Sequence, residues 1–263
     1  MNDLPINTDT INKTIDVIDE STKETRKEID KGAAKGINKL FKLFDASIIG
    51  RKVDVYIAER PYKLDKELKK MRAKYDSIPS EYQVEPSSFI ALHGVEELNY
   101  SLDEEHLKKM FENLLISDMD ARKKGRVLPS YIEIIKQLSK EDALLLQFLK
   151  ENQIMNDPII KIKYIIDDKG NFTYASNNLF LVTNNNYKIL NSIVIDNLLR
   201  LNIVNISFDL HRSDENIYSK CFSQIKDSTL FQKLPNGAKE LGHSDGIIQI
   251  TDFGKNFMNI CLS

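Results

Sequence analysis

The spacing of apolar residues changes near residue 158, and this change restricts the chain to a fold with both helices and strands. Before that point, apolar residues recur every three or four positions, as they do on the buried side of an α-helix. After it, the stretch KIKYIIDDKGNFTYAS (161–176) alternates around Asp168-Lys169-Gly170-Asn171, which predicts a β-hairpin. We therefore expect a mostly α protein of the α+β class.

Breaks in the pattern predict three regions. Residues 1–78 form an N-terminal helical region that is amphipathic, and basic from residue 31. Residues 79–152 form a helical core behind a short linker with prolines at 79 and 86. In this core, residues 101–104 are expected to form a capping box before a helix over 107–115, and Ser139 to cap a helix over 140–151. Residues 153–263 form an α+β module with a small sheet.

The order of elements in the last region is typical of a winged-helix module. We expect helices over 140–151 and 189–201, with strands over 203–208 and 247–251 as the wing. Between these strands, residues 209–245 are expected to be rich in loops, with one short helix near 220–232. A last helix should run from residue 252 to 262.

A winged helix raises the question of DNA binding through the helix at 189–201. The nucleic-acid contacts available there are Lys188 and Arg200, with Asp196 between them. A recognition helix needs several cations, because contacts to phosphates supply much of the affinity. We therefore expect a structural or protein-binding winged helix and no nucleic-acid partner, with a DNA-binding regulator as an alternative.

Charge is segregated along the chain although its total is nearly balanced, with 37 basic and 39 acidic side chains. Residues 31–74 carry 13 basic and 5 acidic side chains, a net of +8, and residues 75–120 carry 2 and 11, a net of −9. The plainest interpretation is that the two blocks pack against each other or occupy opposite faces.

A surface for a membrane or another anion is the alternative interpretation of the basic block. Lys35, Lys39 and Lys42 lie beside Phe41 and Phe44 in the stretch GAAKGINKLFKLFDASIIG. Such a helix can lie in a membrane interface, but a helix in a water-soluble bundle has the same pattern. A membrane-perturbing effector that uses residues 32–57 therefore stays open.

The sequence offers no recognisable catalytic, metal-binding or cofactor-binding pattern. The histidines are dispersed, at His93, His106, His211 and His243, and the cysteines Cys221 and Cys261 lack a metal-site spacing. We therefore expect no enzyme, no catalytic or metal-ligating residues and no cofactor. The acidic N-terminus does not resemble a signal peptide, and no long apolar run occurs. The expected location is the cytoplasm, with the inner membrane face as the alternative for the basic helix.

Four stretches in order resemble a known family. They are FENLL (111–115) with Asp118-Met119-Asp120; LPSYIEIIKQLS (128–139) with EDALLL (141–146); DNLLRLNIV (196–204); and ITDFGKNF (250–257) with Cys261-Leu262. Together they resemble the abortive-infection alpha (Abi-alpha) family of bacterial phage-resistance proteins, over about residue 32 to the C-terminus. Leu128 stands where the family usually has His, and Asn202 where it usually has Gly.

The resemblance implies antiviral defence and no established reaction. Most motif residues have structural explanations: Pro129 would start a helix and Gly254 would allow a close approach at a strand-to-helix turn. Glu133, Lys136 and Gln137 lie on a polar face and are the candidate partner surface. We expect a non-enzymatic abortive-infection protein that contacts an unidentified phage or host protein or arrests growth.

Overall fold

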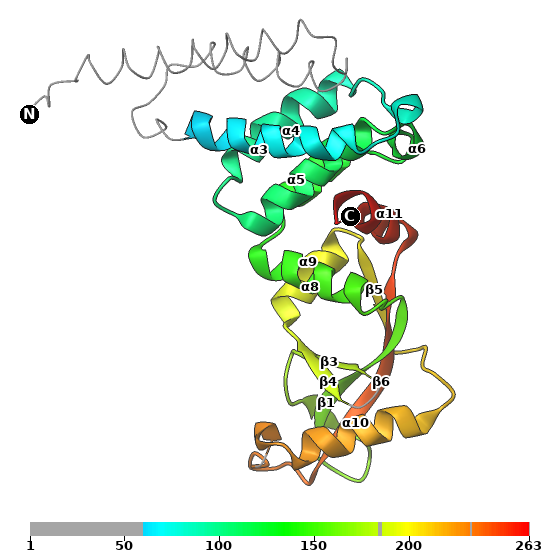
Figure 1. Cartoon of the computed structure of the whole chain (residues 1–263). Coiled ribbons are helices and arrows are strands. Elements are labelled where there is room, and N and C mark those ends of the chain that lie inside the picture. Colours follow the sequence, from blue (N-terminus) through cyan, green and yellow to red (C-terminus); the bar gives the residue numbers. More distant parts are fainter. Residues whose placement is uncertain (1–59, 184–185, 232, 263) are drawn as a thin grey trace, which may run out of the picture. The chain divides into compact units, whose positions relative to one another are not determined.

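The structure is a computed structural model that describes residues 60–183, 186–231 and 233–262. The chain divides into two compact units, Met1–Lys136 and Gln137–Ser263 (Figure 1). The expected membrane or anion surface at Lys35, Lys39, Lys42, Phe41 and Phe44 lies outside the described residues. We describe each unit by itself.

The described part of the first unit is helical. It contains α3 (Arg60–Asp76), η2 (Ser80–Tyr82), α4 (Ser88–Tyr100), α5 (Glu105–Asp118), α6 (Ala121–Lys124) and α7 (Ser130–Lys136). Helices α3, α4 and α7 pack against α5, whose Phe111 and Leu114 are buried. Gly94 of α4 makes the contact close, since a Cβ there would lie 2.8 Å from the Leu115 side chain.

Two predictions about helix ends in this unit have different outcomes. Helix α7 begins directly after Pro129, as predicted. The predicted capping box at residues 101–104 is wrong, because α5 begins after Glu104 without a side-chain capping bond. The start of α4 is held instead by Asp118, which accepts hydrogen bonds from the Ser87 amide at 2.6 Å and hydroxyl at 2.8 Å.

The second unit combines helices with one antiparallel sheet. Its helices are α8 (Lys140–Glu151), α9 (Ser192–Arg200), α10 (Glu215–Asp227), η3 (Thr229–Phe231) and α11 (Asp252–Cys261). Its strands are β1 (Asn156–Ile165), β2 (Phe172–Tyr174), β3 (Leu179–Val182), β4 (Tyr187–Leu190), β5 (Val204–Ser207) and β6 (Glu240–Ile250). The α+β class is therefore confirmed.

The strand order is β4-β3-β1-β6-β5, and β2 pairs with the far end of β1. The longest pairing joins β1 to β6, from Asn156 opposite Gln249 to Ile165 opposite Glu240. The predicted hairpin is confirmed as β1–β2, and the two strands expected as the wing pair as β5 and β6. Strands β3 and β4 were not predicted, and the winged-helix interpretation stays a prediction.

Two boundaries in the second unit differ from the expectation. Strand β6 begins at Glu240, within the stretch predicted as loop, and α10 begins at Glu215 instead of near 220. Helix α9 begins at Ser192, because the side chain of Asn191 caps it by accepting from the Ile193 amide. Lys188 therefore lies in β4 and not on the expected recognition helix.

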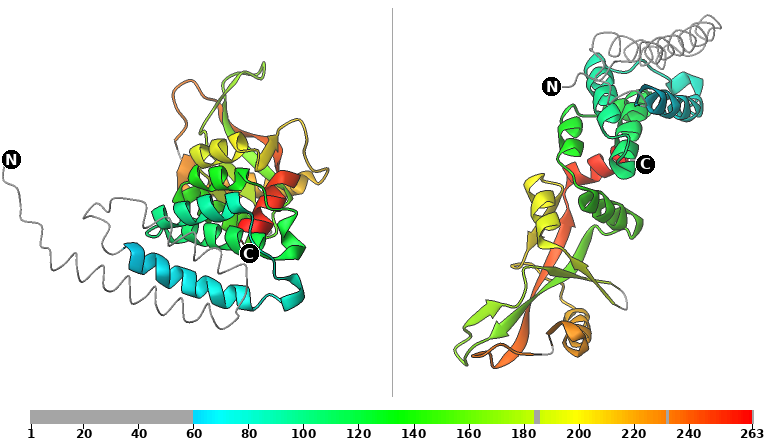
Figure 2. Two further views of the ribbon diagram at one scale, coloured as in Figure 1. Left: turned by 90° about the horizontal axis from the view of Figure 1, so that it is seen from above. Right: turned by 90° about the vertical axis from the view of Figure 1, so that its left-hand side faces the viewer.

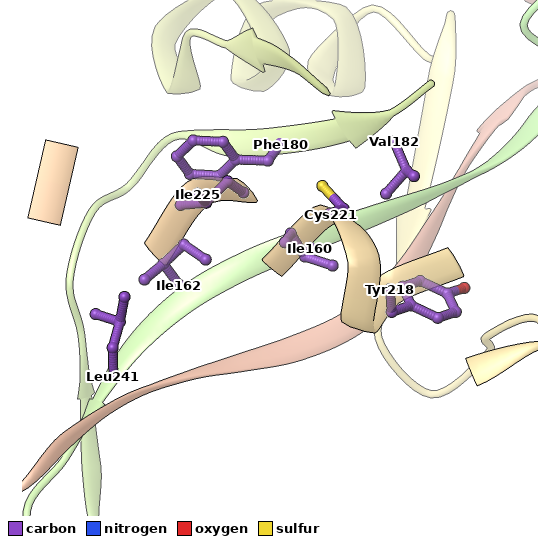
Figure 3. Packing of buried hydrophobic residues seen from close by; sticks show 8 residues of the cluster. All are labelled: Ile160, Ile162, Phe180, Val182, Tyr218, Cys221, Ile225 and Leu241. Atoms are coloured by element: carbon purple, nitrogen blue, oxygen red, sulfur yellow. The ribbon is translucent and has the colours of Figure 1, made fainter. Parts of the chain in front are cut away.

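One face of the sheet, which we call the inner face, packs against α10 (Figures 2 and 3). Its buried cluster joins Ile160, Ile162, Phe180, Val182 and Leu241 of the strands to Tyr218, Cys221 and Ile225 of α10. The Tyr218 hydroxyl donates to the Gly246 carbonyl at 3.2 Å and accepts from the Arg212 amide at 2.9 Å. Residues of β1 at odd positions, such as Lys161 and Lys163, point to the opposite side, the outer face.

Candidate functional site

The start of α8 is fixed by a reciprocal capping box. Ser139 Oγ accepts a hydrogen bond from the Asp142 amide at 3.1 Å, and Asp142 Oδ2 accepts from the Ser139 amide at 2.7 Å and hydroxyl at 2.9 Å. The predicted cap at Ser139 is thus confirmed. The Asp142 side chain therefore lies in the first turn of α8, at the positive end of the helix dipole.

Helix α9 completes this arrangement from the other side. Asn197 donates to Asp142 Oδ2 at 2.8 Å and to the Gln137 carbonyl at 3.0 Å. Arg200 donates to the Asn197 side-chain oxygen at 2.7 Å and to Gln137 Oε1 at 2.8 Å. The result is one continuous hydrogen-bonded network between the start of α8 and one side of α9.

Beside the network lies an open depression of about 410 Å³, which we call the α8–α9 hollow. It is lined by Gln137, Ser139, Asp142, Ile193, Val194, Asp196, Asn197 and Arg200. The Asp142 side chain is buried, and its Oδ1 has no hydrogen-bond partner among the described residues. A buried acceptor without a donor is costly, and because this oxygen has almost no exposed surface, an outside donor could reach it only if neighbouring side chains moved. Ile193 is 77% exposed at the same hollow.

The end of α9 explains the unusual residue at 202. Asn202 has a φ of 55°, in the left-handed region, and its amide donates to the Leu199 carbonyl while the Ile203 amide donates to the Leu198 carbonyl. This is a Schellman motif, in which Gly is the commonest residue and Asn the usual substitute. Asn can therefore replace the Gly of the resembled pattern at this position.

Gly254 lets the turn between β6 and α11 lie close to the residues that follow α9. Any Cβ at this position would collide with the carbonyl oxygen of Ile203. Its amide donates to Thr251 Oγ1 at 2.8 Å, and this hydroxyl donates to the Asn202 carbonyl at 2.6 Å. The close approach predicted for Gly254 is confirmed, so this motif supports the position of α9.

The predicted site residues fall into different places. Of the candidate partner surface, Glu133 and Lys136 belong to the first unit, where Lys136 forms ion pairs with Glu97 at 3.0 Å and Glu133 at 3.6 Å. The hydrogen bond to Glu97 raises the pKa of Lys136. Gln137 belongs to the second unit and binds Arg200, one of the two residues expected to contact nucleic acid. The residues that sequence reasoning missed are Asp142 as an acceptor, Asn197 and Ile193.

Other ionisable clusters have local partners. Burial raises the pKa of Glu112 in α5, against the effect of a hydrogen bond from Lys74 at 3.0 Å. That ion pair joins the basic block to the acidic one. On β6, His243 Nδ1 lies 2.6 Å from Asp245 Oδ1.

Among the described residues, no group of three or more His, Cys, Asp or Glu side chains is placed to hold a metal ion. No described helix is long and apolar enough to cross a membrane.

Comparison with known proteins identifies a family. The model of a family described as abortive infection alpha matches residues 59–261. Neither the curated proteins nor the solved structures yield a match. The matched range includes every residue of the α8–α9 hollow and of its network.

Proposed function

Because this chain belongs to the abortive infection alpha family, we propose that it is a non-enzymatic phage-defence protein that acts by contacting another protein through the α8–α9 hollow. The observation that carries this proposal is the position of the motif residues. Gln137, Ser139 and Asp142 come from one pair of adjoining motifs, and Asp196, Asn197 and Arg200 from a motif about sixty residues later. Six motif residues from two distant stretches line the same hollow.

The chemistry of the hollow suits a protein partner. Ile193 offers an exposed aliphatic side chain, and Gln137, Asp196 and Arg200 supply polar groups around it, which is the usual composition of a small protein interface. A partner segment with an aliphatic side chain next to a backbone amide, lysine or arginine donor would match Ile193 and the exposed carboxylate of Asp196.

A plating assay with point variants tests this proposal. Cells that express the wild-type chain should give fewer plaques than cells without it on at least part of a broad phage panel. Ile193→Glu places a charge at the rim of the hollow and should abolish this protection. Because Ile193 is 77% exposed, the variant should keep its fold and its melting temperature.

Leu234→Glu is the matched control, since Leu234 is also exposed, at 44%, and does not line the hollow. It should protect as well as the wild type. Wild-type cells with unchanged plaque counts on every phage would refute the defence role. Full protection by Ile193→Glu would leave defence standing but refute the hollow as its contact site.

Growth of uninfected cells separates the two modes of action that the sequence leaves open. A protein that only binds a partner during infection should leave uninfected growth unchanged, whereas a growth-arresting effector should slow it on overexpression. Slowed growth that persists in Ile193→Glu would place the toxic activity outside the hollow. This outcome would contradict the proposed mode of action.

A further inference from the structure

The outer face of the sheet carries lysines that lie over aromatic rings. Lys161 Nζ is 3.9 Å from the ring centroid of Tyr174, and Lys163 Nζ is 4.8 Å from that of Phe172. On strand β4, which is separated from β1 by β3, Lys188 Nζ is 4.2 Å from the ring of Phe148 in α8. These are cation–π distances, so each ammonium group is held above a ring.

The strand register places these side chains on one surface. Lys163 is directly opposite Tyr174, and Ile165 is opposite Phe172. Lys188 is opposite Leu181, which is itself opposite Ile159, two positions before Lys161 on β1. Because residues opposite each other share a face, all of these side chains lie on the outer face.

The far part of this face is open. Figure 2, in its right-hand view, shows α10 on one side of the strands, and no helix of the described second unit lies over the other side of the β1–β2 hairpin. Phe172 and Tyr174 are each 44% exposed, and Phe208, which lies over Gly246, is 36% exposed. Between them, β6 presents the small residues Gly242, Ser244 and Gly246 opposite β1. Exposed aromatic rings therefore lie beside a strand whose outward side chains are short.

We propose that this face, formed by Lys161, Lys163, Lys188, Phe172, Tyr174 and Phe208, binds single-stranded nucleic acid. Exposed rings stack on unpaired bases regardless of sequence, and the lysines can meet the backbone phosphates. In a duplex the base faces are already stacked on each other, so the aromatic rings favour a single strand. Acidic groups at the edge are Glu240, opposite Ile165, and Asp168, which pairs with Lys239 at 2.6 Å.

This inference changes an expectation based on the helix at 189–201. That helix has too few cations for a recognition helix, and its Arg200 is bound to Gln137 and Asn197. Lys188, the other residue considered for nucleic acid, lies instead on β4, on the same face of the sheet as Lys161 and Lys163. The alternation of β1 brings these lysines to one side, which a count of charge along the sequence does not show.

Fluorescence anisotropy of the full chain tests the proposal with labelled oligo-dT and oligo-U probes of about 15 nucleotides. Both should bind, and a duplex of equal length should bind at least about tenfold more weakly. Contacts from three lysines to a single strand should reduce the affinity about 20-fold when salt is raised from about 50 to about 200 mM. The ratio of the dissociation constants of oligo-dT and oligo-U shows whether the surface prefers DNA or RNA.

Variants locate the binding surface. The double variant Lys161→Gln/Lys163→Gln should bind roughly tenfold more weakly and show a shallower salt dependence. Its matched control is Lys220→Gln/Lys226→Gln, which removes the same charge from exposed positions on α10. This comparison also cancels any binding by the basic residues before 60. Tyr174→Ala should lose about tenfold in affinity, whereas Tyr174→Phe keeps the ring and should bind like the wild type.

Three results would overturn the proposal. The first is that neither probe binds at low salt. The second is that the two double lysine variants lose the same amount of affinity. The third is that a poly-glutamate peptide binds as tightly as the oligonucleotides. The last result would identify a surface that recognises charge without bases. None of these assays involves infection, so they are independent of the plating test.

Discussion

Neighbouring residues of β1 on the two faces of the sheet have opposite surroundings. Ile160 and Ile162 point to the inner face and are fully buried under α10 (Figure 3). Lys161 and Lys163 point to the outer face and lie over exposed aromatic rings. The same strand therefore stabilises the fold with one set of side chains and presents a surface with the other.

The difference shows how a small unit separates stability from recognition. The outer face is itself buried at one end, where Ile159, Leu181 and Ile248 are fully covered, and it is open only beyond them. Changes on the inner face should thus mainly alter the free energy of unfolding. Changes on the open outer face should mainly alter binding.

The largest expected effect is the difference in cysteine reaction rate between the native and the denatured chain. Cys221 lies in the inner cluster, and both Cys221 and Cys261 are buried. Their reaction with a thiol reagent in the native chain should be roughly a thousandfold slower than in denaturant, because only opening of the structure exposes them. Fast native labelling at Cys221 would show that α10 does not stay on the inner face.

The thiol also makes stability depend on pH. Burial raises the pKa of Cys221 to about 11. Above the ordinary thiol value of 9.0, the unfolded chain therefore loses this proton before the folded chain does. The free energy of unfolding should fall as pH rises from about 9 to about 11, and Cys221→Ser should show a smaller fall. Urea titrations at several pH values measure this slope.

Shortening adjacent side chains of β1 should give the next largest effect. Ile162→Ala removes a buried side chain from the inner cluster and should cost about 3 kcal/mol of the free energy of unfolding. Lys163→Ala, one position later, should cost less than about 1 kcal/mol. Urea denaturation of the two variants measures the difference. Equal losses of unfolding free energy in the two variants would mean that the two faces contribute equally to stability, against what their burial indicates.

The sequence predicted elements whose ends carry local signals. The hairpin depends on Gly170, with a φ of 87°, and on Asp167, whose side chain accepts from the amides of Lys169 and Asn171. The capping box of Ser139 and Asp142 likewise needs residues only three positions apart. Strand β3 was missed because Leu179–Val182 is apolar and buried throughout, so it shows no alternation.

The candidate site needed long-range contacts that no local pattern contains. Gln137 and Arg200 entered two separate hypotheses, as a partner surface and as a nucleic-acid contact, although their side chains bind each other. Which side of α9 meets α8 depends on packing with residues far away in the chain. The missing partner of Asp142 Oδ1 follows from the positions of all its neighbours, so the sequence alone could not predict it.

Two glycines of β6 can show where the outer face becomes open. A Cβ at Gly246 would lie 2.6 Å from the Ser207 carbonyl oxygen and 2.7 Å from the Phe208 ring. Gly246→Ala should therefore cost about 2 kcal/mol of the free energy of unfolding, because backbone must shift. At Gly242 the nearest atom is the end of the Ile165 side chain at 3.0 Å, which can rotate away. Gly242→Ala should cost less than about 1 kcal/mol in the same urea titration.

The smallest expected effect concerns α8, whose Phe148 ring lies 4.2 Å from Lys188 Nζ of β4. Ser139→Ala removes the hydroxyl that accepts from the Asp142 amide, and it should cost about 1 kcal/mol of the free energy of unfolding. Ser139→Thr keeps the acceptor and should recover most of this loss. If α8 is held mainly by its packing, Ser139→Ala and Ser139→Thr will be equally stable. The capping box would then serve mainly to orient Asp142 at the hollow.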